Sequence, residues 1–228
     1  RDDQLDAIQS QALRFFTDLQ RRYPDLPLCL LSSLAEGSDQ LITKVAMQLG
    51  IPVIAPLPFS PELYRSDFER PEALAVFDHQ LAHAEVLELP LRQDNDLDKI
   101  NQPGPARDFH YAQAGIFISS HCHILLALWD GNESELLGGT AQVVAFHLHG
   151  TLPGAVDRRR AALGMLGLDE ESLVYHIPVG RQNSSTPLIT KTSRWLTSDH
   201  ALIFRGTHGL PRRRCSARSP VPRRTPAG

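Results

Sequence analysis

Two spacings of hydrophobic residues alternate along this chain, one typical of helices and one typical of buried strands. Apolar residues at helical spacing predict an amphipathic helix over residues 3–22. Continuous apolar runs predict buried strands at 28–32, 51–55, 86–89, 124–129 and 173–179. Further helices are expected before Gly50, over 61–84 with a break near Pro71, over 111–122, over 140–148 and over 158–166.

The alternation of helix and strand predicts an α/β fold. A mostly parallel sheet with helices on both faces is expected, which is a Rossmann-like three-layer sandwich. Residues 90–107 are polar and rich in Pro and Gly, which predicts a surface loop or flap. We expect one domain over residues 1–180 and a largely irregular or disordered extension over 181–228. Since the chain starts inside a helix, we also expect its first strand to lie upstream.

Two turns rich in small residues follow apolar runs and precede helices. The first holds Ser32, Ser33, Glu36, Gly37 and Ser38. The second begins at Asp130 and ends in Gly138, Gly139 and Thr140. In parallel sheets, ligands collect at the carboxyl ends of the strands, and a helix N-terminus offers unpaired N–H groups to an anion. We therefore expect these nine residues to bind a phosphate-bearing ligand.

Each of these features also has a plain structural interpretation. Ser38 or Asp39 can simply cap a helix, Asp130 can be a turn aspartate, and Trp129 can be a core residue rather than a base-stacking one. Neither turn is a Walker A sequence, and neither has the GxGxxG pattern of a standard dinucleotide fold. The two turns therefore predict a phosphate site without naming a reaction.

Charge argues against a general nucleic-acid surface. The net charge is −3, but residues 205–228 hold seven arginines and no acid, so the rest of the chain has 16 basic and 26 acidic residues. The tail lacks aromatic residues for stacking on bases, and whether it is native is open. Three widely spaced cysteines form no disulfide framework, so we expect buried thiols at Cys29 and Cys122, beside apolar runs, and a cytoplasmic setting. No apolar run has the length of a membrane span.

Metal and nucleophile chemistry find little support. His121 and His123, like His147 and His149, stand two apart, a spacing that puts side chains on different helix faces. No zinc-ligand spacing and no GxSxG nucleophile elbow occurs in the sequence. We expect neither a metal nor a cofactor.

Four further sequence motifs occur in order along the chain. They are Leu31-Ser32-Ser33-Leu34-Ala35-Glu36-Gly37-Ser38-Asp39-Gln40-Leu41, Leu57-Pro58-Phe59 with Tyr64 and Asp67-Phe68, His121 to Gly131, and Gly138-Gly139-Thr140-Ala141-Gln142-Val143-Val144. They resemble the elements SxLAEGADxL, LPxxxxxYxxDF, xCDxLIAxWDG and GGTAEVV of one bacterial family, the SLOG-type domains. The resemblance covers about residues 3–180.

The resemblance implies a Rossmann-like domain related to the LOG phosphoribohydrolases and to DprA. Members sense or process nucleotide-derived ligands, often within larger bacterial proteins. The LOG enzymes carry PGGxGTxxE with a catalytic glutamate. Here Leu137 stands in place of the proline, Gln142 in place of the usual acid and Val143 in place of the glutamate.

These departures favour binding over catalysis. The first hypothesis is therefore a nucleotide sensor domain. An alternative is a LOG-like nucleotide N-glycosidase, for which Glu36 and Asp130 are the candidate catalytic residues. A third is a DprA-like interaction module. A nucleotide-like small molecule is the expected partner, no specific nucleic acid is expected, and a homo-oligomer is left open.

Overall fold

The computed structural model describes residues 2–134, 136–152, 156–157, 172–180 and 192–197. The helix expected over 158–166 lies outside these residues. The elements are α1 (Asp2–Arg22), β1 (Leu30–Leu31), α2 (Ser38–Gln48), β2 (Val53–Leu57), α3 (Pro61–Arg65), α4 (Pro71–Leu81), β3 (Glu85–Glu88), α5 (Leu97–Ile100), α6 (Pro105–His121), β4 (Ile124–Trp129), α7 (Thr140–His149), β5 (Thr151–Leu152), β6 (Val156–Asp157), β7 (Leu173–Pro178) and β8 (Arg194–Thr197).

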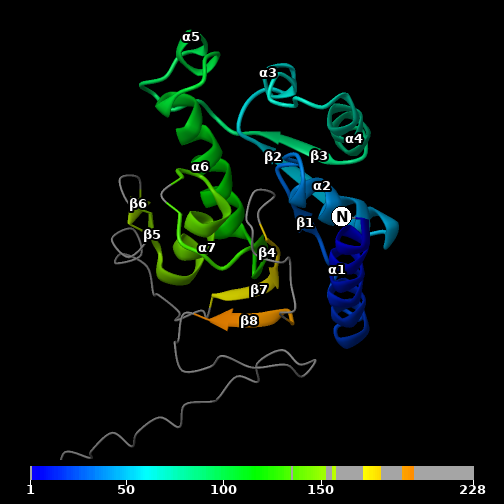
Figure 1. Cartoon of the computed structure of the whole chain (residues 1–228). Helices are drawn as coiled ribbons and strands as arrows, with labels where there is room; N and C mark the ends of the chain where they lie inside the picture. The colour runs from blue at the N-terminus through cyan, green and yellow to red at the C-terminus, as the bar shows by residue number, and fades with distance from the viewer. Residues whose placement is uncertain (1, 135, 153–155, 158–171, 181–191, 198–228) are drawn as a thin grey trace, which may run out of the picture.

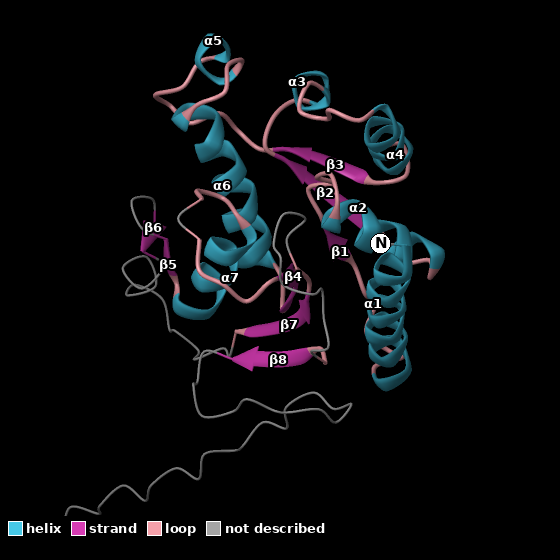
Figure 2. Cartoon of the chain, in the orientation of Figure 1, coloured by secondary structure: helices cyan, strands magenta, loops and turns pink. Residues whose placement is uncertain are grey.

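The strands form small sheets that are mostly parallel (Figure 2). One sheet has the order β1-β2-β3 with parallel pairing throughout. Another has the order β4-β7-β8, in which β7 is parallel to β4 and β8 is antiparallel to β7. Strands β5 and β6 form a separate antiparallel pair. The chain is therefore a mixed α/β protein, as the alternating pattern predicts.

Helices pack against both faces of strand β4, because successive side chains of a strand point to opposite sides. Leu126 and Leu128 pack in one hydrophobic cluster with α1 and α2. Leu125 and Ala127 pack in another cluster, with side chains of α6 and α7. Figure 1 shows the same separation, with α1 and α2 apart from α6 and α7. The apolar run at 124–129 is a buried strand for this reason.

Local signals explain where several elements begin and end. Ser60 caps α3 by accepting a hydrogen bond from the N–H of Leu63, and Pro61 and Pro71 open α3 and α4. Gly150 ends α7 in the left-handed conformation, with φ 72°. The predicted break near Pro71 is confirmed, since α3 and α4 are separate helices.

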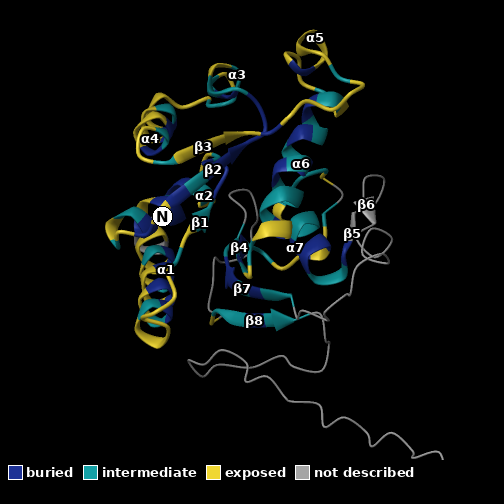
Figure 3. Cartoon of the chain, turned by 180° about the vertical axis from the view of Figure 1, so that it is seen from behind, coloured by how far each residue is buried: buried dark blue, intermediate teal, exposed yellow. Residues whose placement is uncertain are grey.

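Four details differ from the expectations. The polar stretch 90–107 contains the short helix α5 and the start of α6. Strand β8 follows the segment expected to be the last strand. The thiol of Cys29, expected to be buried, is exposed, and strand β3 is exposed along its length (Figure 3). Burial of a continuous apolar run needs cover on both sides, and the described part of the sheet β1-β2-β3 lacks it there.

Candidate functional site

The two predicted turns meet at one small pocket of about 180 Å³, which we call the inter-turn pocket. Ser33 and Asp39 line it from the first turn and helix α2, and Gly138 and Thr140 line it from the second. The rest of the wall comes from α6, from β4 and from Pro58 and Tyr64. Ser33 follows the carboxyl end of β1, where ligands collect in parallel sheets, and the middle residues of β4, Leu125 to Ala127, form the adjoining wall.

Helix α7 presents uncapped backbone N–H groups at this pocket. Its N-cap residue is Gly139, which has no side chain to accept a hydrogen bond from the N–H groups at the start of α7. Gly138, just before it, has φ +77° and packs against the backbone of α6, where an added Cβ would lie 2.7 Å from the N atom of Ala112. The turn therefore needs glycine to sit this close to α6.

Asp39 is the ionisable side chain of the first turn that reaches the pocket. It is the second residue of helix α2 and is half-buried. Burial raises its pKa from 3.8 to about 6, although a hydrogen bond from the backbone of Ala35 acts in the opposite direction. At neutral pH this carboxylate accepts hydrogen bonds, so it suits a hydroxyl-bearing ligand better than a phosphate.

A buried ion pair supports the wall that carries Tyr111. The hydroxyl of Tyr111 donates to Asp67 Oδ2, and Arg107 Nη2 donates to Asp67 Oδ1 at 2.5 Å. The Arg107 side chain is 6% exposed, also donates to the carbonyl of Ile100, and stacks on the ring of Phe59 at 4.4 Å. Burial and the neighbouring carboxylate raise the pKa of Tyr111, so its hydroxyl stays protonated and can donate.

Several predicted residues have other partners. Glu36 pairs with Arg70 at 2.5 Å on the surface. The carboxylate of Asp130 accepts a hydrogen bond from the N–H of Asn132 at 2.9 Å, which is an Asx turn. Glu36, Gly37, Gly139 and Asp130 do not line the inter-turn pocket, whereas Ser33, Gly138 and Thr140 do.

The hydroxyl groups of the first turn mainly hold the turn itself. Ser32 accepts hydrogen bonds from the N–H of Leu34 at 3.3 Å and from the hydroxyl of Thr43 at 3.0 Å. Ser33 donates to the carbonyl of Pro56 at 3.0 Å. Ser32 and Ser38 line a second, larger cavity described below. Five of the nine predicted residues lie in the first turn, and among these five Ser33 alone lines the inter-turn pocket.

Of the residues that depart from the LOG pattern, Val143 lines the pocket and makes that part of its wall apolar, whereas Gln142 supports the turn. Gln142 Oε1 accepts a hydrogen bond from the N–H of Gly138 at 3.2 Å, which closes the turn. Val143 lines the pocket and packs on α6, where a Cβ added to Gly115 would lie 2.5 Å from Val143 Cγ2. Val143 therefore offers no carboxylate at the position where the LOG enzymes carry one.

Asp39, Tyr64 and Tyr111 belong to the pocket although the expected site omitted them. Tyr111 could have been found from its spacing, because Ala114, Gly115 and Ile118 follow it on one helix face and leave space beside it. Asp39 reads equally well as a helix cap, and only its burial distinguishes the two roles.

The described residues hold no group of three or more His, Cys, Asp or Glu side chains placed to bind a metal. Within the same residues, no helix combines the length and the apolar character needed to cross a membrane. Comparison with family models, with curated proteins and with solved structures finds no match to this chain.

The raised pKa of Asp39 predicts a pH-dependent stability. The folded state binds this proton more tightly than the unfolded state, so ionisation weakens the fold as pH rises from about 4 through about 6. Asp39→Asn removes the ionisation. The parent should therefore lose stability between pH 4 and pH 7, and the variant should not. The unfolding free energy of the variant minus that of the parent should be larger at pH 7 than at pH 4, by on the order of 1–3 kcal/mol.

Urea unfolding at both pH values measures this difference. Asp98→Asn is the matched control, because that side chain is exposed in α5 and its substitution should leave the difference near zero. An equal response of both variants would show that Asp39 is not buried as described.

Proposed function

We propose that this chain is a nucleotide-binding sensor domain whose inter-turn pocket holds a phosphate and the adjoining ribose. The observation that carries the proposal is that Ser33 and Asp39 from one turn line the same pocket as Gly138 and Thr140 from the other. Two turns about 100 residues apart in sequence contribute polar groups to one small, mostly apolar pocket, and this arrangement suits one ligand with two kinds of polar group.

The two ends of the pocket suit different parts of such a ligand. The uncapped N-terminus of α7 favours an anion, so the phosphate lies against Thr140 and the turn before it. The Asp39 carboxylate repels phosphate and accepts from hydroxyl groups, so the ribose lies toward α2. The pocket volume of about 180 Å³ is small for a ligand site, so the pocket holds the phosphate and the ribose and leaves the base outside.

The SLOG resemblance supports the same proposal, since its motifs supply both turns. The proposal extends to the fold: the two sheets belong to one Rossmann-like three-layer domain, with α1 and α2 on one face and α6 and α7 on the other. It also places the domain in a bacterial cytoplasmic protein. The apolar Val143 in the wall, with Gln142 used to hold the turn, favours a sensor over a hydrolase.

One observation favours a second candidate, a nucleotide N-glycosidase. Asp39 is a half-buried carboxyl group in the pocket with a pKa of about 6, which is the range that acid–base catalysis uses. Asp39 therefore replaces Glu36 and Asp130 as the acid to test.

A thermal-shift series with AMP, GMP and ADP-ribose tests the proposal. At 100 times its Kd, a ligand that binds only the folded state adds about 2.7 kcal/mol to the unfolding free energy. We expect at least one compound to raise the melting temperature by several degrees. Asp39→Asn and Gly139→Val should reduce the shift, while Ser66→Ala, a change at an exposed hydroxyl beyond α3, should preserve it.

Free base measured in the same samples separates the two candidates. A shift without base release supports the sensor. Release that stops in Asp39→Asn supports the glycosidase. If no compound shifts the parent, or if Asp39→Asn and Gly139→Val shift as much as the parent, the site is not where we place it.

A further inference from the structure

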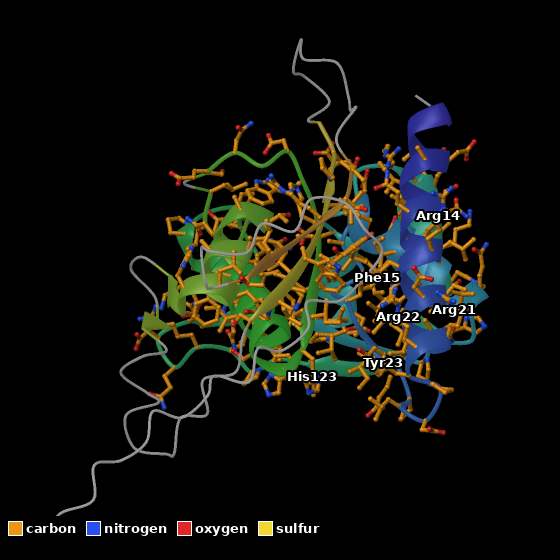
Figure 4. The ribbon with its side chains drawn as sticks, turned by 90° about the horizontal axis from the view of Figure 1, so that it is seen from below. Arg14, Phe15, Arg21, Arg22, Tyr23 and His123 are labelled. Carbon is orange, nitrogen blue, oxygen red and sulfur yellow. The ribbon has the colours of Figure 1, made fainter. Side chains whose placement is uncertain are left out.

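A cavity of about 690 Å³ separates the two three-stranded sheets, and we call it the inter-sheet cleft. Its walls come from both helical layers, with Phe15 and Leu19 of α1 on one side and Phe117 and Ile118 of α6 on the other. Figure 4 shows Phe15 on the side of α1 that faces the strands. Since helices from opposite faces line one cavity, the cleft passes through the sheet layer itself.

The edges of β1 and β4 that border the cleft have main-chain groups available for pairing. The N–H groups of Leu30 and Ser32 donate to carbonyls of residues 52 and 54, on the β2 side. Main-chain groups of successive strand residues point to opposite sides, so those of Leu31 face the cleft. By the same alternation, Trp129 faces β7, where its carbonyl accepts from the N–H of Val179, and Leu128 faces the cleft.

No strand among the described residues pairs with either of these edges. Exposed edges with unpaired N–H and C=O groups are templates for another strand, and proteins usually cover them. Here two such edges border the same apolar cavity, and the strands that carry them belong to parallel ladders. The complementary shape is an extended segment with apolar side chains on both faces.

We propose that the inter-sheet cleft is the docking site of one extended apolar strand that leads into α1, runs parallel to β1 and β4, and joins the two sheets into one. A strand residue occupies roughly 160 Å³, from a rise of about 3.3 Å, a strand spacing of about 4.8 Å and a layer of about 10 Å. The cleft, which also reaches Glu85 to Leu87 of β3, therefore has room for about four residues, the length of an ordinary short strand.

The position of α1 selects this source over a second copy of the chain. A strand parallel to β1 ends at the edge of the sheet where α2 begins, and the N-terminal end of α1 lies near α2 (Figure 1). Helix α1 already packs across the cleft, because it contacts α2 and its Phe15 ring stacks on Tyr175 of β7 at 4.4 Å. The docked strand and β1 then form a parallel βαβ unit in which α1 is the crossover helix.

Hydrogen exchange on a fusion protein tests the proposal. The probe is the hexapeptide Ala-Val-Val-Val-Ile-Gly joined to Arg1 of the 228-residue chain by a Gly-Ser linker. The matched control is Ala-Pro-Val-Pro-Ile-Gly, in which two prolines remove N–H donors. We expect exchange at the amides of Leu31 and Leu128 to slow at least tenfold in the probe fusion and to stay unchanged in the control. The amide of Ala127, which faces β7, should not respond in either.

Three results would overturn the proposal. Unchanged exchange in the probe fusion shows that the cleft does not take this strand. Equal slowing in the proline control shows apolar collapse without strand pairing. Slow exchange at Leu31 and Leu128 in the unfused chain, together with a dimeric mass in solution, shows that a second copy fills the cleft. None of these readouts depends on nucleotide binding, so this proposal and the proposed function fail separately.

Discussion

Replacing Arg107 with methionine should destabilise the fold by about 2–4 kcal/mol, because it leaves the Asp67 carboxylate without its cationic partner. Methionine keeps most of the apolar stem over Phe59, so the change isolates the lost charge and hydrogen bonds. The Arg107 side chain is 6% exposed and that of Asp67 is 25% exposed, which places the loss toward the lower part of the range for buried pairs.

Arg65→Met is the matched control for this substitution. Arg65 also pairs with an aspartate, Asp78, at 2.8 Å, but both side chains are more than a third exposed. An exposed pair contributes at most about 1 kcal/mol, so this variant should unfold almost with the parent in urea. Asp67→Asn added to Arg107→Met should recover part of the loss. Equal losses in the two single variants would contradict the description of Arg107 as buried.

Gly138→Ala should cost about 3 kcal/mol, the second large effect that we expect. A residue with a side chain is strained at φ +77°, by roughly 1–2 kcal/mol. The new Cβ would also lie 2.7 Å from the N atom of Ala112 and 3.0 Å from the carbonyl carbon of Tyr111, and overpacking of this kind adds about 1–3 kcal/mol. Urea unfolding measures the total.

Gly50→Ala separates the two causes. Gly50 has a similar φ of +68°, and an added Cβ there would meet no atom within 4 Å. This control should show the backbone strain alone, so the difference between the two variants reports the contact between the second turn and α6. If both variants lose the same free energy, the turn does not pack on α6, and the pocket wall described here is wrong.

Local sequence signals predicted much of the framework. The run Ile124–Trp129 is strand β4 as expected, because its continuous apolar character reflects packing on both faces. Helix α7 begins at Thr140, directly after the turn that ends at Gly139, as the small residues before a helical pattern predict. The short helix α5 and strand β8 were not predicted, since four-residue elements carry too little periodicity.

The sequence predicted the location of the site better than it predicted the side chains that line it. Ser33, Gly138 and Thr140 line one pocket, as expected for turns that follow strands of a mostly parallel α/β fold. The partners of the charged residues could not be read from the sequence: Glu36 pairs with Arg70 and Asp67 with Arg107, 34 and 40 residues apart. Such pairings depend on how helices pack, which no local pattern encodes.

The most direct test of the shared pocket is a titration with AMP followed by the backbone amide signals of Asp39 and Thr140. If the two turns form one site, both signals shift together and give one Kd. Asp39→Asn should then raise that Kd by about tenfold, as expected for the loss of about 1.4 kcal/mol of hydrogen bonding to a charged group. Signals that saturate at different concentrations, or a Thr140 signal that moves while Asp39 stays fixed, would contradict a single site built from both turns.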